Sequence, residues 1–194
     1  MRYDSEHKAR TRARVVQEAA ATIRAVGPDG IGVAGLMAKV GLTHGGFYAH
    51  FKSKEDLVAE AVGQMFDDSR AMFEFRTEGR TPADGLASYI DFYLSEQHRD
   101  QTERGCPLPR LSNELARLPG PARDRFAAGA AGLTGRVAEL LEKLGIPDAE
   151  LVAASMVSEM VGALALARAV PDREQSSRIL EASRDGLKRR LGVA

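Results

Sequence analysis

The chain has 194 residues, enough for one large domain or two small ones, and its composition, 44% hydrophobic and 28% charged, is ordinary for a globular protein. The first 18 residues are too polar for a secretory signal, and the apolar run 151–167 is short for a membrane span and contains Glu159, so we expect no membrane segment. The single cysteine, Cys106, excludes an intramolecular disulfide framework and favours a location in the reducing cytoplasm.

The net charge of zero conceals an uneven distribution along the chain. Residues 1–54 carry nine Lys or Arg against four Asp or Glu, a net charge of +5, whereas residues 55–194 carry 18 against 23, a net charge of −5. A basic end on an acidic body predicts an anionic partner for the first 54 residues, although chance alone can produce a split of this size.

Helical periodicity runs through nearly the whole chain, and no segment alternates like a strand. The sequence therefore predicts an all-α protein of about nine helices, with a basic DNA-binding domain at 1–54 and a helical ligand-binding and dimerisation bundle at 55–194. The expected helices span about 7–26, 33–40, 44–51, 54–77, 82–100, a short stretch within 104–121, 122–144, 148–170 and 172–191.

Several helix boundaries have specific start or stop signals. Gly27 and Pro28 end the first helix. Thr43 can cap the helix at 44–51, and Ser53, with an acidic residue three positions later, reads as a capping box for the long helix that follows. Thr81 before a proline is another start signal.

The stretch KVGLTHGGFYAHFKSKEDL, residues 39–57, has the outline of a helix-turn-helix, two short helices joined by a tight turn containing glycine. In such a unit the second helix enters the DNA major groove with its N-terminal residues. A threonine hydroxyl, tyrosine, histidine and lysine suit phosphates and base edges, and the adjacent glycines would let the backbone come close to the groove. The candidate DNA-contacting residues are Thr43, His44, Gly45, Gly46, Tyr48, His50 and Lys54. Alternatively, the glycines belong to a plain loop and the aromatic residues to the core.

This stretch resembles the helix-turn-helix signature of TetR-type transcriptional regulators. The matching residues are Gly41, Thr43, Tyr48, His50, Phe51, Lys54 and Leu57. The resemblance implies a homodimeric, ligand-responsive protein, usually a repressor, in which Thr43, Tyr48 and Lys54 hold phosphates. It also implies that His44, Gly45 and Gly46 face bases.

The chain departs from the usual pattern of this family at three positions. Gly32 stands where a capping Ser or Thr is common, Gly46 where a hydroxyl residue is common, and Ala49 where a larger polar residue is common. We expect these departures to affect which operator is read more than whether DNA is bound.

The helix expected at 148–170 is apolar almost all round, so it must be buried on two sides. Its small residues Ala154, Ser158 and Gly162 form a row that lets another helix approach closely. The last helix carries Leu180 and Leu187 on one stripe. The resemblance implies that these two helices form a dimer interface, and we include all five residues in it; the alternative is burial within one subunit.

The middle of the chain is rich in aromatic residues and methionine, which either form ordinary core or line an apolar ligand cavity. The candidate pocket residues are Met65, Phe66, Met72, Tyr89, Phe92, Tyr93, Leu108, Phe126 and Met160. Such a cavity suits an unidentified small-molecule effector that is hydrophobic or electrophilic. Ligand binding there would shift the population between DNA-competent and DNA-incompetent states.

Cys106 lies near Arg104 and a helix start, where a lowered pKa would make it a thiol sensor of electrophiles or oxidants. The resemblance implies the same role, because some of these regulators use a Gly-Cys pair in this way. The general behaviour of free cysteine favours the alternative, a small buried hydrophobic residue.

Enzyme signatures are absent from the sequence: it has no G-x-S-x-G, H-E-x-x-H, P-loop, G-x-G-x-x-G or C-x-x-C motif, and its four histidines lack metal-ligand spacing. We therefore expect no enzyme activity, cofactor or metal. The prediction is a cytoplasmic homodimer that binds a palindromic double-stranded DNA operator and is released by its ligand. The alternative is a ligand-binding helical bundle, or an activator without classical repression.

Overall fold

The computed structural model of the chain describes residues 2–114, 118 and 120–193, with side chains from residue 6 onward, and within these ranges it contains helices and turns but no strand. The all-α prediction is confirmed. The elements in chain order are α1 (Arg2–Val26), η1 (Pro28–Gly30), α2 (Val33–Lys39), η2 (His44–Ala49), α3 (Lys54–Thr77), α4 (Pro82–Tyr93), α5 (Glu96–Asp100), η3 (Thr102–Arg104), α6 (Leu108–Leu111), α7 (Gly120–Lys143), α8 (Ala149–Ala169) and α9 (Arg173–Leu191), where η marks a 3₁₀ helix.

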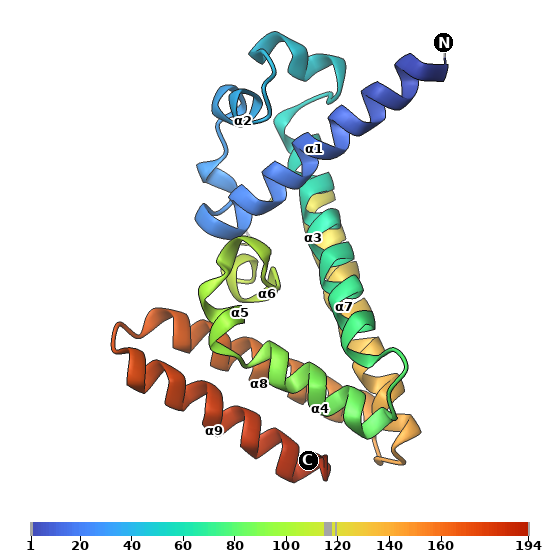
Figure 1. Cartoon of the computed structure of the whole chain (residues 1–194), viewed down its shortest axis with the longest axis vertical. Coiled ribbons are helices and arrows are strands. Elements are labelled where there is room, and N and C mark those ends of the chain that lie inside the picture. The colour runs from blue at the N-terminus through green and yellow to red at the C-terminus, as the bar shows by residue number, and fades with distance from the viewer. Residues whose placement is uncertain (1, 115–117, 119, 194) are drawn as a thin grey trace.

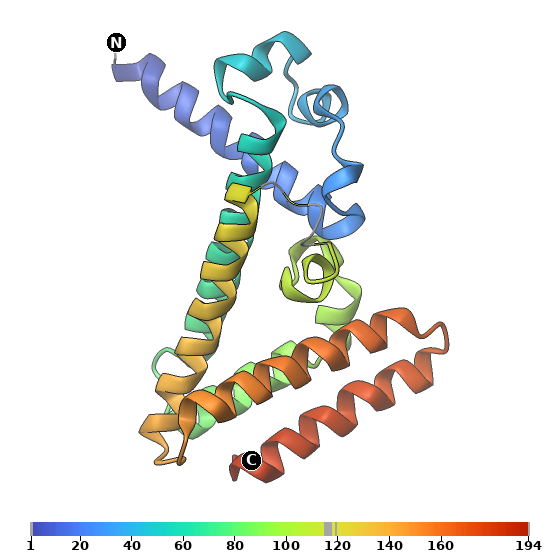
Figure 2. The same ribbon diagram turned by 180° about the vertical axis from the view of Figure 1, so that it is seen from behind.

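The N-terminal elements α1, α2 and η2 form a head at one end of the molecule (Figure 1). Helices α3 and α7 lie side by side and run away from this head, and α8 crosses their far end (Figures 1 and 2). Helix α9 packs against α8, and α4 contacts α3, α7 and α9. The long helix α3 contacts both α1 and α7, so it connects the head to the body.

The expected capping residues begin their helices as predicted. The Ser53 hydroxyl accepts a hydrogen bond from the Asp56 N–H at 3.2 Å, and the Thr81 hydroxyl accepts one from the Asp84 N–H at 3.2 Å. Each cap satisfies a backbone donor that has no partner within the helix. Gly41 follows α2 with a φ of 75°, a left-handed conformation that glycine adopts without strain, and it makes the turn into η2.

The single helix expected at 82–100 is in fact two helices, because α4 ends at Tyr93 and α5 begins at Glu96. Ser95 lies at the break. Its hydroxyl donates to the Phe92 carbonyl at 2.7 Å and accepts from the His98 N–H at 3.1 Å. The side chain thus competes with the helical hydrogen bonds and caps a new helix.

The short proline-bracketed helix is confirmed as α6, which is only four residues long. Part of the stretch expected to hold it, residues 115–117 and 119, lies outside the described residues. The segment expected as a short helix at 44–51 is a 3₁₀ helix, η2, rather than an α-helix.

Helices α3 and α7 pack closely at Gly129. A Cβ at this position would lie 2.1 Å from Cγ of Phe66, closer than any real contact, so the fold requires glycine here. The Phe66 ring instead meets Phe126 edge to face, with 5.6 Å between ring centroids.

Helix α8 has one buried and one uncovered face in the single chain. Ala153, Met156 and Met160 are buried against the body, whereas Leu151 and Leu166 are 73% and 60% exposed. By length and composition alone α8 is apolar enough to cross a membrane, but a core helix passes the same test, and here α7 and α9 pack against it.

Candidate nucleic-acid interface and cavity

Two buried aromatic side chains, one in η2 and one just after it, attach this segment to the protein core. Phe47 and Phe51 are 1% and 2% exposed, and their rings stack with 5.3 Å between centroids. At the start of the segment the Thr43 hydroxyl accepts a hydrogen bond from the Gly46 N–H at 3.3 Å. Because this uses the oxygen as an acceptor, the hydroxyl proton remains available to donate to a phosphate.

The polar residues predicted to contact DNA lie together on the outer face of η2. Thr43, His44 and Gly45 are exposed, and Tyr48 is 69% exposed. The Tyr48 ring lies edge-on to the buried Phe47, with 5.2 Å between centroids, so the core orients a tyrosine whose polar end faces outward.

The adjacent glycines are not required by the packing of the protein itself. No heavy atom lies within 4 Å of a Cβ built on Gly45, and a Cβ on Gly46 would make only ordinary contacts, 3.6 Å from the Thr43 hydroxyl oxygen being the closest. Neither residue has a positive φ. The packing of the chain itself therefore does not explain why both positions are glycine.

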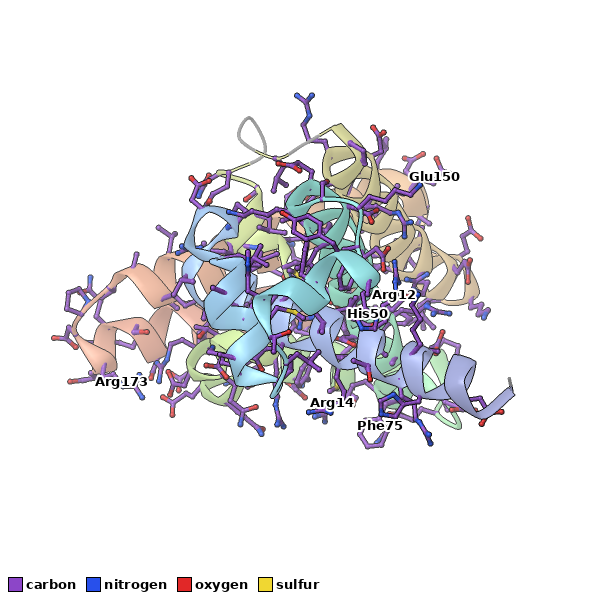
Figure 3. The ribbon with its side chains drawn as sticks, turned by 90° about the horizontal axis from the view of Figure 1, so that it is seen from above. Arg12, Arg14, His50, Phe75, Glu150 and Arg173 are labelled. Atoms are coloured by element: carbon purple, nitrogen blue, oxygen red, sulfur yellow. The ribbon has the colours of Figure 1, made fainter. Side chains whose placement is uncertain are left out.

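Two arginines of α1 that the sequence reasoning missed hold the helix-turn-helix in place. Arg12 donates from Nε to the His50 carbonyl at 3.2 Å, forms a bidentate ion pair with Glu60 of α3, and lies over the Phe51 ring at 4.8 Å. Arg14 donates to the Val40 carbonyl at 3.1 Å. Figure 3 looks down on this end of the molecule and shows Arg12 beside His50. The partners of both arginines lie at least 26 positions away in the chain, so no local sequence pattern indicated this role.

His50 and Lys54 flank the exposed face. Burial and the nearby positive charges of Lys8, Arg12 and His7 lower the pKa of His50, so its ring is neutral at pH 7. His50 can therefore offer a phosphate a hydrogen bond but no positive charge. Lys54 lies in the first turn of α3, where its cation adds to the positive end of the helix dipole.

A cavity of about 860 Å³ lies between α1 and the body. Four of the predicted pocket residues, Met72, Tyr89, Phe92 and Tyr93, line it, and so does Cys106. The other five predicted pocket residues are buried but do not line this cavity, because their side chains fill the core between helices. These are Met65, Phe66, Leu108, Phe126 and Met160.

His98 lies in the cavity wall with both ring nitrogens occupied. Its Nδ1 donates to the Tyr93 carbonyl at 2.8 Å, and its Nε2 accepts from the Cys106 N–H at 2.9 Å. The ring also stacks on Phe92 with 5.1 Å between centroids. Burial lowers the pKa of His98 to about 4, so the residue is a neutral, structural part of the wall at pH 7. Sequence reasoning missed it.

Cys106 is 8% exposed, and burial raises the pKa of its thiol. This is the opposite of the lowered pKa expected from its position near Arg104. The raised pKa disfavours the reactive thiolate at neutral pH, although the residue does border the cavity.

The residues predicted for a dimer interface divide between the surface and the core. Ala154, Ser158 and Gly162 lie on the exposed face of α8, in line with Leu151 and Leu166. Leu180 and Leu187 of α9 are each 1% exposed, because they pack within their own chain. We therefore limit the candidate interface to these exposed residues of α8, which we call the α8 stripe: Leu151, Ala154, Ser158, Gly162 and Leu166. The two leucines of α9 belong to the core of their own chain.

Comparison with known proteins identifies both parts of the chain. Residues 15–61 match the family described as bacterial regulatory proteins, tetR family, and residues 82–183 match the tetracyclin repressor-like C-terminal domain. No curated protein matches the chain by sequence.

Several solved structures share the fold over nearly their whole length. A TetR transcriptional regulator from Chloroflexus aurantiacus is 28% identical, with 94% of each chain covered and a TM-score of 0.80. A TetR-family regulator from Agrobacterium tumefaciens is 23% identical, with 94% of this chain and 98% of that chain covered and a TM-score of 0.80. The reduced form of NemR from E. coli is 20% identical, with 92% of this chain and 95% of that chain covered and a TM-score of 0.81.

Proposed function

The chain belongs to the TetR family of DNA-binding bacterial regulators, and from this premise we propose that it is a ligand-released repressor that acts as a homodimer on a palindromic operator. The observation that carries the proposal is the outward face of η2. There Thr43, His44 and Tyr48 are exposed at the basic end of the chain, above a buried pair of phenylalanines.

The uncovered face of α8 supports the homodimer. After Glu150 in its first turn, the exposed residues of the helix are apolar or small, and two exposed leucines lie along the same stripe. A second copy related by a two-fold axis would bury this stripe and present two copies of η2 to one palindrome, with half-sites about one helical turn apart.

The position of the cavity supports release by a ligand. Arg14, Gln17 and Arg24 of α1 form one side of the cavity, and residues of α3 and α4 form another. A molecule that fills the cavity touches the head and the body together, so it can change the position of the head relative to the operator. Since the partner is bacterial DNA, we place the protein in the cytoplasm.

The experiment that tests this proposal is selection of random duplex DNA on the purified protein, followed by sequencing of the bound fragments. We expect an enriched palindrome. Absence of enrichment at low salt by the folded, ligand-free protein would contradict the proposal and favour a ligand-binding bundle without DNA contact. A reporter driven from the selected site would separate a repressor from an activator, because deletion of the gene should raise expression only in the first case.

A further inference from the structure

Two residues that line the cavity carry a buried hydrogen-bond donor without a nitrogen or oxygen partner among the described residues. These donors are the Nε of Arg24 and the hydroxyl of Tyr93, in residues that are 6% and 1% exposed. Both residues line the cavity between α1 and the body. The Tyr93 hydroxyl does donate to the Cys106 sulfur, but a thiol is only a weak acceptor, so an oxygen acceptor would be a stronger partner. A buried donor without a good acceptor is unfavourable, so a bound molecule that supplies the acceptor gains affinity.

The rest of the Arg24 guanidinium is held in place by the protein. It donates to the Asp68 carboxylate at 2.8 Å and to the Met65 carbonyl at 3.2 Å. These contacts orient the side chain and leave Nε as its unused donor.

Two of the carboxylates that line the same space are engaged within the protein, and a third, that of Glu103, belongs to an exposed residue. Asp68 accepts from Arg24 with one oxygen and from Gln64 with the other, and Glu18 pairs with Lys39 at 2.9 Å. His98 uses both ring nitrogens within the protein. Among the buried side chains of the wall, the unpartnered groups are therefore the donors on Arg24 and Tyr93, and these suit an acceptor group.

The apolar part of the wall is largely aromatic. Tyr89, Phe92 and Met72 line the cavity beside Tyr93, and the volume of about 860 Å³ lies within the usual range for small-molecule sites. An apolar ring system with one polar group matches this division between aromatic surface and buried donors.

We propose that the cavity binds a flat, apolar molecule that carries a carboxylate or carbonyl group, and that this group accepts hydrogen bonds from the Tyr93 hydroxyl and Arg24 Nε. The inference rests on the proposed function, because it assumes that this cavity is the site where the effector binds. It adds the chemical class of the effector, which is an acceptor-bearing aromatic compound and not an organic cation.

Three probes with the same ring test the proposal: naphthalene-2-carboxylate, 2-methylnaphthalene and (2-naphthyl)methylammonium. The chain contains no tryptophan, so naphthalene fluorescence anisotropy reports binding without interference from that residue. We expect the carboxylate to bind most tightly and the ammonium most weakly. Equal or tighter binding of either acceptor-free probe, or no binding of the carboxylate at millimolar concentration, would overturn the inference.

Two substitutions identify the atoms involved. Tyr93→Phe removes only the hydroxyl, and Arg24→Lys keeps the charge that faces Asp68 but removes Nε. Each should weaken the affinity for the carboxylate by about fivefold or more, as expected for loss of a hydrogen bond to a charged group. The affinity for 2-methylnaphthalene should stay within about twofold of the parent value. Thr134→Val, which removes a hydroxyl of α7 outside the cavity, should leave the affinity of all three probes unchanged. Parent affinity for the carboxylate in both cavity variants, with circular dichroism showing that they are folded, would overturn the inference.

Release of operator DNA is measured separately with the same probes. Binding of the carboxylate without release of DNA would leave the ligand class standing and contradict the ligand-released repressor. Release of DNA by 2-methylnaphthalene as readily as by the carboxylate would support the effector site and overturn the proposed ligand class.

Discussion

Single residues of the head have distinguishable expected roles in DNA binding. Lys54 provides a cation at the start of α3, whereas His44 is an exposed, polar residue at the start of η2. A phosphate contact adds affinity for any sequence and releases counterions, but a contact with a base edge discriminates between sequences.

Lys54→Ala should therefore weaken binding to every duplex and reduce the slope of log affinity against log salt by about one unit for each subunit. His44→Ala should instead change the preference among operator variants and leave the salt slope nearly unchanged. Fluorescence anisotropy with labelled duplexes over a range of salt concentrations measures both. Parent-like binding of all duplexes by both variants would show that η2 does not contact DNA.

His98 makes stability depend on pH. The folded protein holds the pKa of His98 at about 4, below the ordinary 6.5 that applies when the chain is unfolded. Between these values the unfolded chain binds a proton that the folded chain does not. The free energy of unfolding should therefore fall as pH decreases below 6.5, by about 2 kcal/mol between pH 7.5 and pH 5.

Urea unfolding at these two pH values measures the change. His98→Gln, which keeps a donor and an acceptor but does not titrate, is the control, and it should lose most of the pH dependence. A remainder is expected from His50, whose pKa is also lowered. An unchanged pH dependence in the variant would show that His98 is not the group responsible.

At the scale of elements, the head and the α3–α7 pair use glycine for different reasons. Gly45 has open space around its missing Cβ, and Gly129 has the Phe66 ring there. Only the second glycine is required by the packing of the protein itself.

Gly45→Ala should leave the free energy of unfolding unchanged or raise it by up to about 1 kcal/mol, because the unfolded chain loses freedom. Its affinity for the operator should fall by about tenfold, or about 1.4 kcal/mol, because the added methyl group separates the backbone from the groove. Gly129→Ala should instead lower the free energy of unfolding by about 1–3 kcal/mol. Urea unfolding and operator titration measure both quantities, and a Gly45→Ala variant with parent affinity would assign this glycine to a plain loop.

At the scale of the whole molecule, the exposed stripe of α8 is a largely apolar surface of the body that remains uncovered in the single chain. A homodimer would bury it and would at the same time double the contacts with DNA. Loss of the dimer should therefore appear in both the mass in solution and the affinity for a palindrome.

Ala154→Glu places a carboxylate in the α8 stripe, where the single chain leaves room for it. The variant should remain folded, become monomeric and lose most of its affinity for the full palindrome. Ala131→Glu makes the same change on the exposed surface of α7 and should keep the parent mass and affinity. Light scattering after size-exclusion chromatography gives the mass, and a dimeric Ala154→Glu variant would place the interface elsewhere.

The sequence by itself determined the features that depend on neighbouring residues. Ser53 and Thr81 predicted helix starts because a cap acts within three residues, and Gly41 marked the turn of the helix-turn-helix because its conformation is local. The ordered residues of the stretch 39–57 likewise indicated the family, and the periodicity indicated an all-α fold. Ser95 was missed because its hydroxyl broke a helix whose apolar pattern continued through it.

Only the tertiary structure decided which side chains from distant segments meet. Apolar character does not distinguish a cavity wall from core, so Met72 and Tyr89 line the cavity whereas Phe126 and Met160 do not. The partners of Arg12 lie at least 38 positions away in the chain, and no local pattern shows them. In the sequence, Leu187 and Gly162 were equally plausible interface residues. The packing of α9 on α8 buries Leu187 within its own chain and leaves Gly162 exposed. The reason is that burial depends on how whole helices are rotated against each other.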